Sequence, residues 1–211
     1  MSIEIGENLT ESFGYSKDKI GGNIGTWIIL AILSIIPIVN FIAVGTFLKI
    51  YRGAEPKLEN IGKAFVDGFL AFIIAFIYML IPTILSIIIA VFLVFDPMAG
   101  PLSIFTGLTP LGIVLIAVCI VLFILLGLLL TPALINFARS GFGSAFSFGK
   151  IFGMISKAGW VNYILSIIII GIIFGAISLL SLIPFIGFII ILILSPFLTC
   201  WSVRFYANIF E

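Results

Sequence analysis

The sequence predicts an all-α fold: a polytopic bundle of about six transmembrane helices in three hairpins, with short amphipathic helices on the cytoplasmic side. Of the 211 residues, 63% are hydrophobic and only 9% are charged, whereas soluble domains average about 25% charged residues. The apolar runs are continuous, unlike the short alternating segments of a membrane β-barrel. Only helices satisfy their own backbone hydrogen bonds within such runs in lipid, so the fold must be helical.

Six apolar segments carry this fold, and the last four are long enough to span a bilayer as single helices. These four cover about 68–95, 111–138, 160–182 and 187–208. A bilayer core about 30 Å thick needs about 20 helical residues. The first two segments, 21–36 and 38–53, are marginal in length and only the turn at Pro37 separates them. They form either a spanning hairpin, which we favour, or a re-entrant pair.

The positions of the basic residues predict the orientation of the chain. If six helices span, all ten lysines and arginines fall on the same side of the membrane. The opposite side has the turns at Pro37 and Pro184 and the stretch 96–110, whose Asp96 is the only charge there. The positive-inside rule then places both termini in the cytoplasm.

Two nine-residue stretches are almost the same, and they indicate an internal duplication. LSIIPIVNF covers residues 33–41, and LSLIPFIGF covers residues 180–188. Proline ends a helix readily because it lacks an N–H and restricts the residue before it. We therefore expect a single membrane domain over residues 1–211, built from parallel repeats. The repeats cover about 1–53, 54–139 (a weak match) and 140–211.

Each repeat begins with an amphipathic segment. These segments cover residues 2–19, 57–68 and 142–158. In the first, Ile5, Leu9 and Phe13 recur every four residues and share one helical face. We expect all three segments to be helices that lie in the inner membrane interface.

Seven basic residues at this interface are the candidate contacts for lipid phosphates or an acidic partner. They are Lys17, Lys49, Arg52, Arg139, Lys150, Lys157 and Arg204. The alternative interpretation is topological, because the positive-inside rule alone accounts for basic residues at the cytoplasmic side. The expected partners are membrane lipids and either further copies of the chain or another membrane protein. The net charge of +1 gives no reason to expect nucleic acid.

The sequence contains little that could support catalysis. No ionisable residue lies near the centre of an expected span, where proton relays and ion-coupling sites are usually found. Histidine is absent, so the commonest metal ligand and a serine–histidine pair are both excluded. A serine–lysine pair stays formally open. We expect no enzyme activity, no metal site and no cofactor.

Polar residues within the expected spans allow a second interpretation, a small permease or channel for an uncharged solute. Its candidate path residues are Tyr78, Thr131, Asn136 and Ser195. Ordinary packing of a helix bundle would explain the same residues. A G-x-x-x-G motif at Gly171 and Gly175 would allow close helix packing, either within the chain or between copies of it.

Four stretches resemble a known family. They are IGENLTESFGYSKDK, LSIIPIVNF, LKIYRG and IGKAFVDGF, all within residues 5–69. The chain is similar to the domain-of-unknown-function family 4013, multipass membrane proteins found largely in archaea. This resemblance implies a prokaryotic cytoplasmic membrane and no catalytic residue. The function that we expect is that of a non-enzymatic scaffold, accessory or lipid-interacting component.

Overall fold

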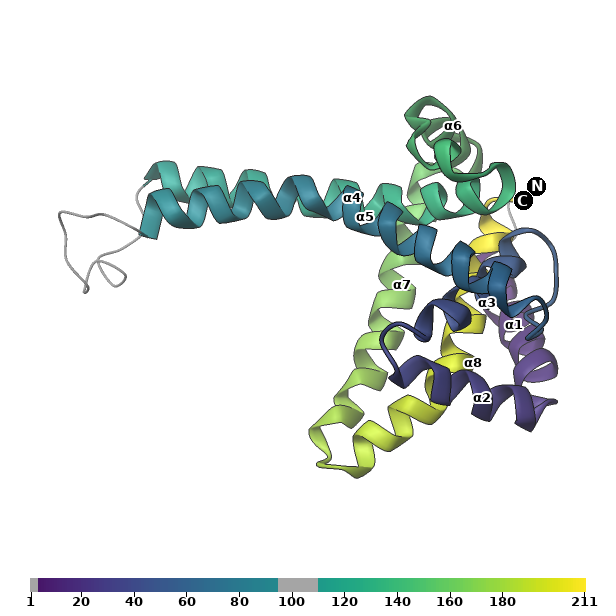
Figure 1. Ribbon diagram of the computed structural model, residues 1–211. Helices are drawn as coiled ribbons and strands as arrows, with labels where there is room; N and C mark the ends of the chain where they lie inside the picture. Colours follow the sequence, from purple (N-terminus) through teal and green to yellow (C-terminus); the bar gives the residue numbers. More distant parts are fainter. Residues whose placement is uncertain (1–3, 95–109) are drawn as a thin grey trace. The chain divides into compact units, whose positions relative to one another are not determined.

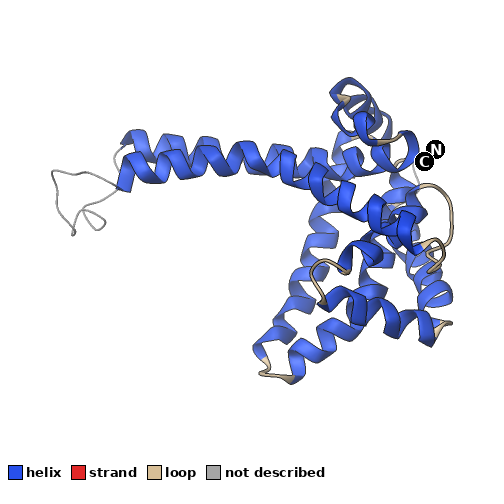
Figure 2. Ribbon diagram, viewed as in Figure 1, coloured by secondary structure: helices blue, strands red, loops and turns tan. Residues whose placement is uncertain are grey.

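The computed structural model describes residues 4–94 and 110–211, and every regular element within these ranges is a helix (Figure 2). The predicted all-α class is therefore confirmed. The chain divides into two compact units. Unit 1 contains Met1–Phe72 and Pro132–Glu211, and unit 2 contains Ile73–Thr131.

Eight α-helices and three shorter helical turns follow one another along the described residues (Figure 1). In chain order they are α1 Ile5–Ser16, η1 Lys17–Gly21, α2 Ile24–Ile35, α3 Asn40–Tyr51, α4 Ile61–Val94, α5 Pro110–Ser140, η3 Phe142–Phe146, α6 Phe148–Ala158, α7 Trp160–Ser178, η4 Leu179–Leu182 and α8 Ile186–Ile209. The two units share α4 and α5, because the unit boundaries fall within these helices.

Four helices are long and apolar enough to cross a membrane. They are the spans Ile61–Ile89, Ile113–Ser140, Trp160–Leu182 and Ile186–Ile209, which match the last four predicted segments. Their mean hydropathies run from 2.3 to 3.5. The chain is thus a multipass membrane protein. The four spans in α4, α5, α7 and α8 would give an even number of crossings.

Of the six predicted spans, the described residues provide four long ones, and the first hairpin is the part that differs. Helices α2 and α3 have 12 residues each, so each is about 18 Å long, well short of a bilayer core of about 30 Å. The segment Ile5–Gly21 bends by 93° into α2, and this bent pair could count as a fifth span at most. The geometry therefore favours the re-entrant form of residues 21–53, which the sequence had left as the alternative.

The two proline turns have nearly the same backbone. Ile36 has φ −90° and ψ 113°, and Ile183 has φ −85° and ψ 108°, the extended conformation that a following proline favours. The amide of Asn40 donates to the carbonyl of Ile36 at 2.8 Å, and that of Gly187 donates to Ile183 at 3.0 Å. The matching LS-I-P sequences therefore build matching turns, while the internal repeat itself stays a prediction.

The amphipathic segments differ from the expectation in two ways. The face of α1 that is buried holds Asn8, Ser12 and Ser16, and it packs on α8, so the helix is held by its polar stripe. The segment 57–68 is not a separate interfacial helix, because α4 begins at Ile61 and continues into a span. Only α6 has the expected form, with Ile151 and Ile155 buried and its other faces exposed.

Close helix packing occurs at glycines other than those of the G-x-x-x-G motif. A Cβ added to Gly45 would lie 1.8 Å from the carbonyl oxygen of Ala64, and one added to Gly68 would lie 1.9 Å from that of Phe41. Helices α3 and α4 therefore cross backbone to backbone in unit 1. A Cβ at Gly171 or Gly175 would meet no described atom within 4 Å, so this motif makes no close contact within the described residues.

Unit 2 consists of the parts of α4 and α5 that run side by side (Figure 1). Large apolar side chains on both helices are exposed, among them Phe76, Ile81, Val118 and Ile124. A helix pair that is apolar on nearly all its outer faces fits a lipid environment rather than water.

Candidate functional site

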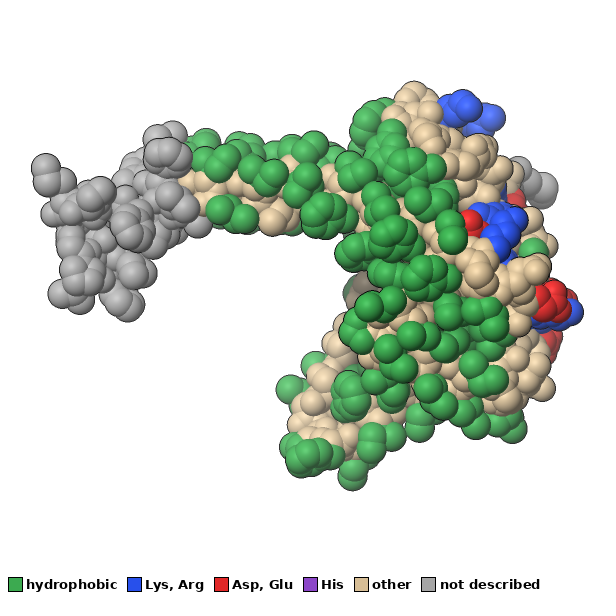
Figure 3. Space-filling model, viewed as in Figure 1, with side chains coloured by type: hydrophobic (Ala, Val, Ile, Leu, Met, Phe, Trp, Pro, Cys, Tyr) green, Lys and Arg blue, Asp and Glu red, His purple; other side chains and the backbone are tan. Residues whose placement is uncertain are grey.

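The charged side chains of unit 1 gather on one side of the molecule in the view of Figure 3, and both ends of the chain lie on that side in Figure 1. We call this region the charged end. The predicted basic contacts Arg52, Arg139 and Arg204 lie together, since Arg52 bonds to Ala138, Arg139 bonds to Tyr51 and Phe210, and Arg204 pairs with Glu211. The rest of the visible surface is mostly apolar, so the charged end is where unit 1 can meet water and polar headgroups.

Two of the predicted basic contacts anchor the connection between α3 and α4. The Nζ of Lys49 donates to the carbonyls of Lys57 and Glu59 at 2.7 and 2.8 Å. The guanidinium of Arg52 pairs with Asp67 at 2.5 Å. These contacts hold a non-helical stretch against the ends of two helices, so both side chains have structural partners.

Arg139 and Arg204 also join distant parts of unit 1. Arg139 donates from Nε to the carbonyl of Tyr51 at 3.0 Å and from Nη1 to the carbonyl of Phe210 at 2.8 Å. Arg204 pairs with Glu11 at 3.1 Å, and its guanidinium carbon lies 5.1 Å from the ring centre of Tyr15. Partial burial raises the pKa of Tyr15 to about 12, so the ring stays neutral beneath the arginine.

The other three predicted contacts have a different environment. Lys17, Lys150 and Lys157 are exposed, and the side chain of none of them has a hydrogen bond or an ion pair within residues 4–94 and 110–211. Lys63, which the sequence analysis did not select, is also exposed, and its side chain has no hydrogen bond or ion pair within the described residues. These lysines are therefore the cations of the charged end that remain available to a ligand.

A further ion pair near this end involves no predicted site residue. The carboxylate of Glu55 contacts Lys19 at 2.5 Å and Lys57 at 3.0 Å. These two ammonium groups lower the pKa of Glu55 to about 2, so its charge persists throughout the physiological range. The same contact raises the pKa of Lys57. The cluster fixes the loop before α4 and leaves the candidate site unaffected.

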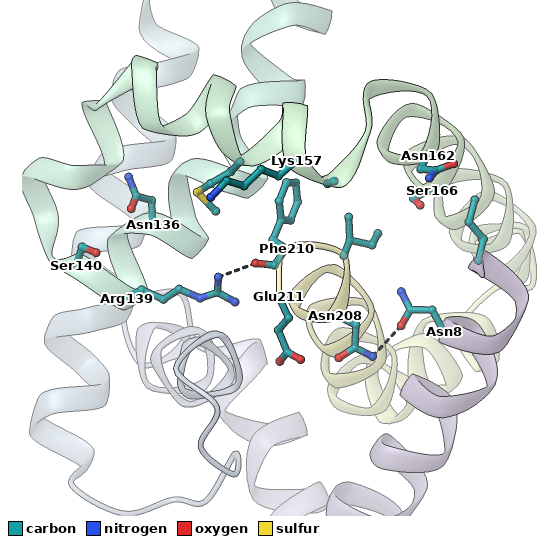
Figure 4. A pocket seen from close by; sticks show the side chains of 14 residues that line it. Asn8, Asn136, Arg139, Ser140, Lys157, Asn162, Ser166, Asn208, Phe210 and Glu211 are labelled. Carbon is teal, nitrogen blue, oxygen red and sulfur yellow. Dashed lines mark hydrogen bonds between the residues drawn. The ribbon is translucent and has the colours of Figure 1, made fainter. Parts of the chain in front are cut away.

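A cavity of about 480 Å³ opens at the charged end between α1, α5, α6, α7 and α8. Most of its lining side chains are polar, and Figure 4 shows them around a common space. They are Asn8, Asn136, Arg139, Ser140, Lys157, Asn162, Ser166, Asn208 and Glu211. All of the lining residues belong to unit 1. The arrangement can bind a small polar ligand, but no described group of three or more His, Cys, Asp or Glu could hold a metal ion.

A buried hydrogen-bond network forms one wall of the cavity. The amide of Asn208 donates to the side-chain oxygen of Asn8 at 2.8 Å, as drawn in Figure 4, and it also contacts the carboxylate of Glu11. Asn8 in turn donates to the carbonyl of Phe205 at 3.1 Å and accepts from Ser12 at 3.1 Å. The network ties α1 to α8 and explains why the polar stripe of α1 is its buried face.

Two buried polar atoms of residues that line the cavity have no hydrogen-bond partner within the part of the chain that the structure describes. They are the hydroxyl oxygen of Ser166 and the side-chain oxygen of Asn208. Their residues are only 1% and 7% exposed. A buried polar group without a partner is unfavourable, typically by about 1–3 kcal/mol. A hydrogen bond from a ligand or a water to either atom would relieve this cost.

The predicted solute-path residues are divided between the two units. Asn136 lines the cavity and donates to the carbonyl of Ser144 at 2.6 Å. Ser195 does not line it, and its hydroxyl donates to the carbonyl of Leu192 in its own helix at 2.8 Å. Tyr78 and Thr131 belong to unit 2. The path therefore remains a prediction without support from unit 1.

Sequence reasoning missed six polar residues that line the cavity: Asn8, Ser140, Asn162, Ser166, Asn208 and Glu211. A usable signal was present, since Asn162 and Ser166 are four residues apart in an otherwise apolar segment and so share a helical face. Asn208 and Arg204 have the same spacing. The meeting of these faces from α1, α7 and α8 depends on tertiary packing.

Comparison with known proteins places the chain among uncharacterised sequences. The family model described as "Protein of unknown function (DUF4013)" matches residues 29–186. The uncharacterized protein MJ1189 of Methanocaldococcus jannaschii is 33% identical over 159 residues. This alignment covers 71% of the chain and 52% of the relative, so the chain spans about half the length of the curated relative that it matches. No solved structure matches the chain. The resemblance found in the sequence is thereby confirmed.

Proposed function

Since this chain belongs to the domain-of-unknown-function family 4013, which supplies no activity, we propose a function from its geometry alone. The chain is a non-enzymatic component of a prokaryotic cytoplasmic membrane that holds anionic lipid headgroups at its cytoplasmic face. It acts there as a scaffold or accessory protein. Both termini lie in the cytoplasm, in agreement with the positions of the basic residues.

The observation that carries this proposal is the set of unpaired lysines at the charged end. Lys17, Lys150 and Lys157 are exposed and have no partner among the described residues. An exposed ammonium near the surface of an anionic membrane contributes about 1 kcal/mol to lipid attraction. The other four basic residues form contacts with protein groups, so they contribute to lipid attraction mainly through the electrostatic field of the charged end. They are Lys49, Arg52, Arg139 and Arg204.

Helix α6 gives Lys150 and Lys157 a depth that suits contact with lipid headgroups. Its Phe148 and Phe152 are exposed, and the ring of Phe152 lies 6.0 Å from that of Trp160 at the start of α7. Aromatic side chains of this kind favour the headgroup region of a bilayer. Lys150 and Lys157 are seven residues apart, so they project from one face of α6. Such a helix lies in the interface with its lysines close to phosphate groups.

The proposal is tested by the lipids that remain bound to the protein. The triple variant K17Q/K150Q/K157Q and the wild type are purified from membranes in mild detergent, and retained phospholipids are counted by mass spectrometry. We expect the triple variant to bind anionic phospholipid on the order of 100-fold more weakly and to retain correspondingly less of it, because three contributions of about 1 kcal/mol are removed.

The matched control is K17R/K150R/K157R, which preserves all three charges and should retain anionic lipid at the wild-type level. Equal retention by the wild type and the glutamine variant would contradict the proposal. So would an equal preference for zwitterionic lipid in all three proteins.

A further inference from the structure

We propose that the cavity at the charged end binds a phosphate ester of a small polyol, as found in glycerol phosphate. The ester enters either as a free metabolite or as the headgroup of a phospholipid. This inference deepens the proposed function and rests on it for the location of the cavity at the membrane–water boundary. The proposed function requires only electrostatic attraction between lysines and anionic headgroups, and this inference adds a specific site and a ligand chemistry.

The size and place of the cavity suit such a ligand. Its volume is about 480 Å³, within the range of roughly 300–1,000 Å³ that is usual for small-molecule sites. Its lining comes from helices that are distant in sequence, so it exists only in the folded unit. The residues Ile5, Ile209 and Phe210 add apolar surface, against which the carbon atoms of a polyol or an acyl stem could lie.

Two cations in the lining can receive the phosphate. Lys157 lines the cavity and has no partner within the described residues. Arg139 uses Nε and Nη1 for two backbone carbonyls, and a guanidinium has five N–H donors, so three remain. The one acid of the lining, Glu211, is paired with Arg204 at 3.5 Å. The lining therefore has a net positive charge that favours an anion.

The two unpartnered atoms favour hydroxyl groups beside the phosphate. The side-chain oxygen of Asn208 can only accept a hydrogen bond, so the dianionic phosphate group of a monoester, which has no proton to donate, cannot satisfy it. The hydroxyl of Ser166 can both donate and accept. A polyol hydroxyl matches both needs, while a choline headgroup has no donor at all. The cavity is therefore complementary to a phosphate ester that also carries free hydroxyl groups.

Helix α6 offers a matched pair of variants for the test. Lys150 and Lys157 are both exposed and unpaired on this helix, but only Lys157 lines the cavity. The variants are K157Q, its control K150Q and S166A, which removes one hydroxyl without adding bulk. Thermal unfolding of each purified variant establishes that it is folded, and K157Q alters only an exposed side chain.

The first arm measures the binding of glycerol 3-phosphate and of inorganic phosphate to the purified chain in detergent by calorimetry. The second arm counts phosphatidylglycerol retained from nanodiscs that also contain phosphatidylcholine. In at least one arm the polyol ester should bind about tenfold more weakly to K157Q and about three- to tenfold more weakly to S166A. K150Q should leave the first arm unchanged and should lower the second arm only by the roughly fivefold that about 1 kcal/mol of surface attraction gives. Dependence in the first arm identifies a soluble ester, and dependence in the second identifies a lipid headgroup.

Other results would overturn the inference. Equal loss in K150Q and K157Q would leave general lipid attraction intact and remove the specific site. Inorganic phosphate that binds as tightly as glycerol 3-phosphate, with S166A unchanged, would contradict the polyol assignment. If K157Q and S166A weaken glycerol 3-phosphate binding in the first arm but the triple lysine variant retains anionic lipid normally, the inference stands and the proposed function falls.

Discussion

At the scale of single residues, the basic side chains of unit 1 separate into two groups that sequence alone cannot distinguish. Lys49 and Arg139 donate to backbone carbonyls, whereas Lys150 and Lys157 have no partner among the described residues. All four satisfy the positive-inside pattern equally well. Which cation is free depends on which carbonyls and carboxylates the fold brings near it.

The buried amide network at the wall of the cavity gives a prediction at this scale. Replacement of Asn8 by alanine removes its bond to Phe205 and deprives Asn208 and Ser12 of their acceptor. We expect N8A to lower the free energy of unfolding by about 1–3 kcal/mol, because buried partners lose their hydrogen bonds. Unfolding in detergent, followed by helical circular dichroism, measures the change.

The control for this variant lies on the same helix. Thr10 is exposed, and its hydroxyl bonds only to the carbonyl of Gly6. T10A should therefore change stability by less than about 0.5 kcal/mol. If T10A lowered the free energy of unfolding as much as N8A, α1 would be sensitive to any substitution, and the hydrogen-bond network would have no particular role in stability.

At the scale of elements, the sequence identified the four long helices well and the short ones less well. Continuous apolar runs longer than a bilayer thickness have one stable form, so α4, α5, α7 and α8 follow from hydropathy. The bends between α1 and α2 and between α2 and α3 do not follow from hydropathy, because they depend on local contacts. Asn23 caps α2 by accepting from the amide of Thr26 at 3.1 Å, which stabilises the 93° bend.

The crossing of α3 and α4 gives a prediction at the scale of elements. Gly68 leaves no room for a Cβ, which would lie 1.9 Å from the carbonyl oxygen of Phe41. G68A must separate the two helices and should lower the free energy of unfolding by about 1–3 kcal/mol. The loss of helical signal on heating in detergent reports the change.

Gly62 is the matched control, since it lies on the same helix and a Cβ there would meet no described atom within 4 Å. G62A should leave stability unchanged or raise it by up to about 1 kcal/mol, because alanine favours the helix. Equal behaviour of the two variants would mean that the close crossing is absent in the membrane.

At the scale of the whole molecule, the number and direction of the membrane crossings decide how the charged end is presented. Four long helices return the chain to its starting side, and a re-entrant first hairpin leaves that result unchanged. The predicted orientation thus survives the correction of the first two segments. It rests on the charge pattern and remains a prediction.

Labelling of single cysteines in intact cells tests this orientation, with an impermeant reagent and with Cys119 and Cys200 replaced. A cysteine at Ser103, which lies outside the described residues, should react from outside. A cysteine at Lys150 should react only after the membrane is opened. Reaction of position 150 in intact cells would reverse the topology.

The same measurement separates the two forms of the first hairpin. Ile38 is at the tip of the α2–α3 turn and is 67% exposed in the structure. In a re-entrant hairpin of two helices about 18 Å long, a cysteine at this tip lies within the lipid and should react from neither side. Labelling of position 38 from outside would restore the spanning hairpin.

The sequence by itself determined that this protein is an all-helical membrane protein, which helices are long enough to cross, and which family it belongs to. These properties follow from composition, run length and local motifs, all of which are written along the chain. Tertiary structure alone decided that the first hairpin is short, that the polar stripe of α1 is buried on α8, and that Asn8, Ser166 and Asn208 meet Arg139 and Lys157 around one cavity. The physical reason is that a site of this kind depends on contacts between residues about 200 positions apart, such as Asn8 and Asn208, and no local pattern records which helix faces will meet.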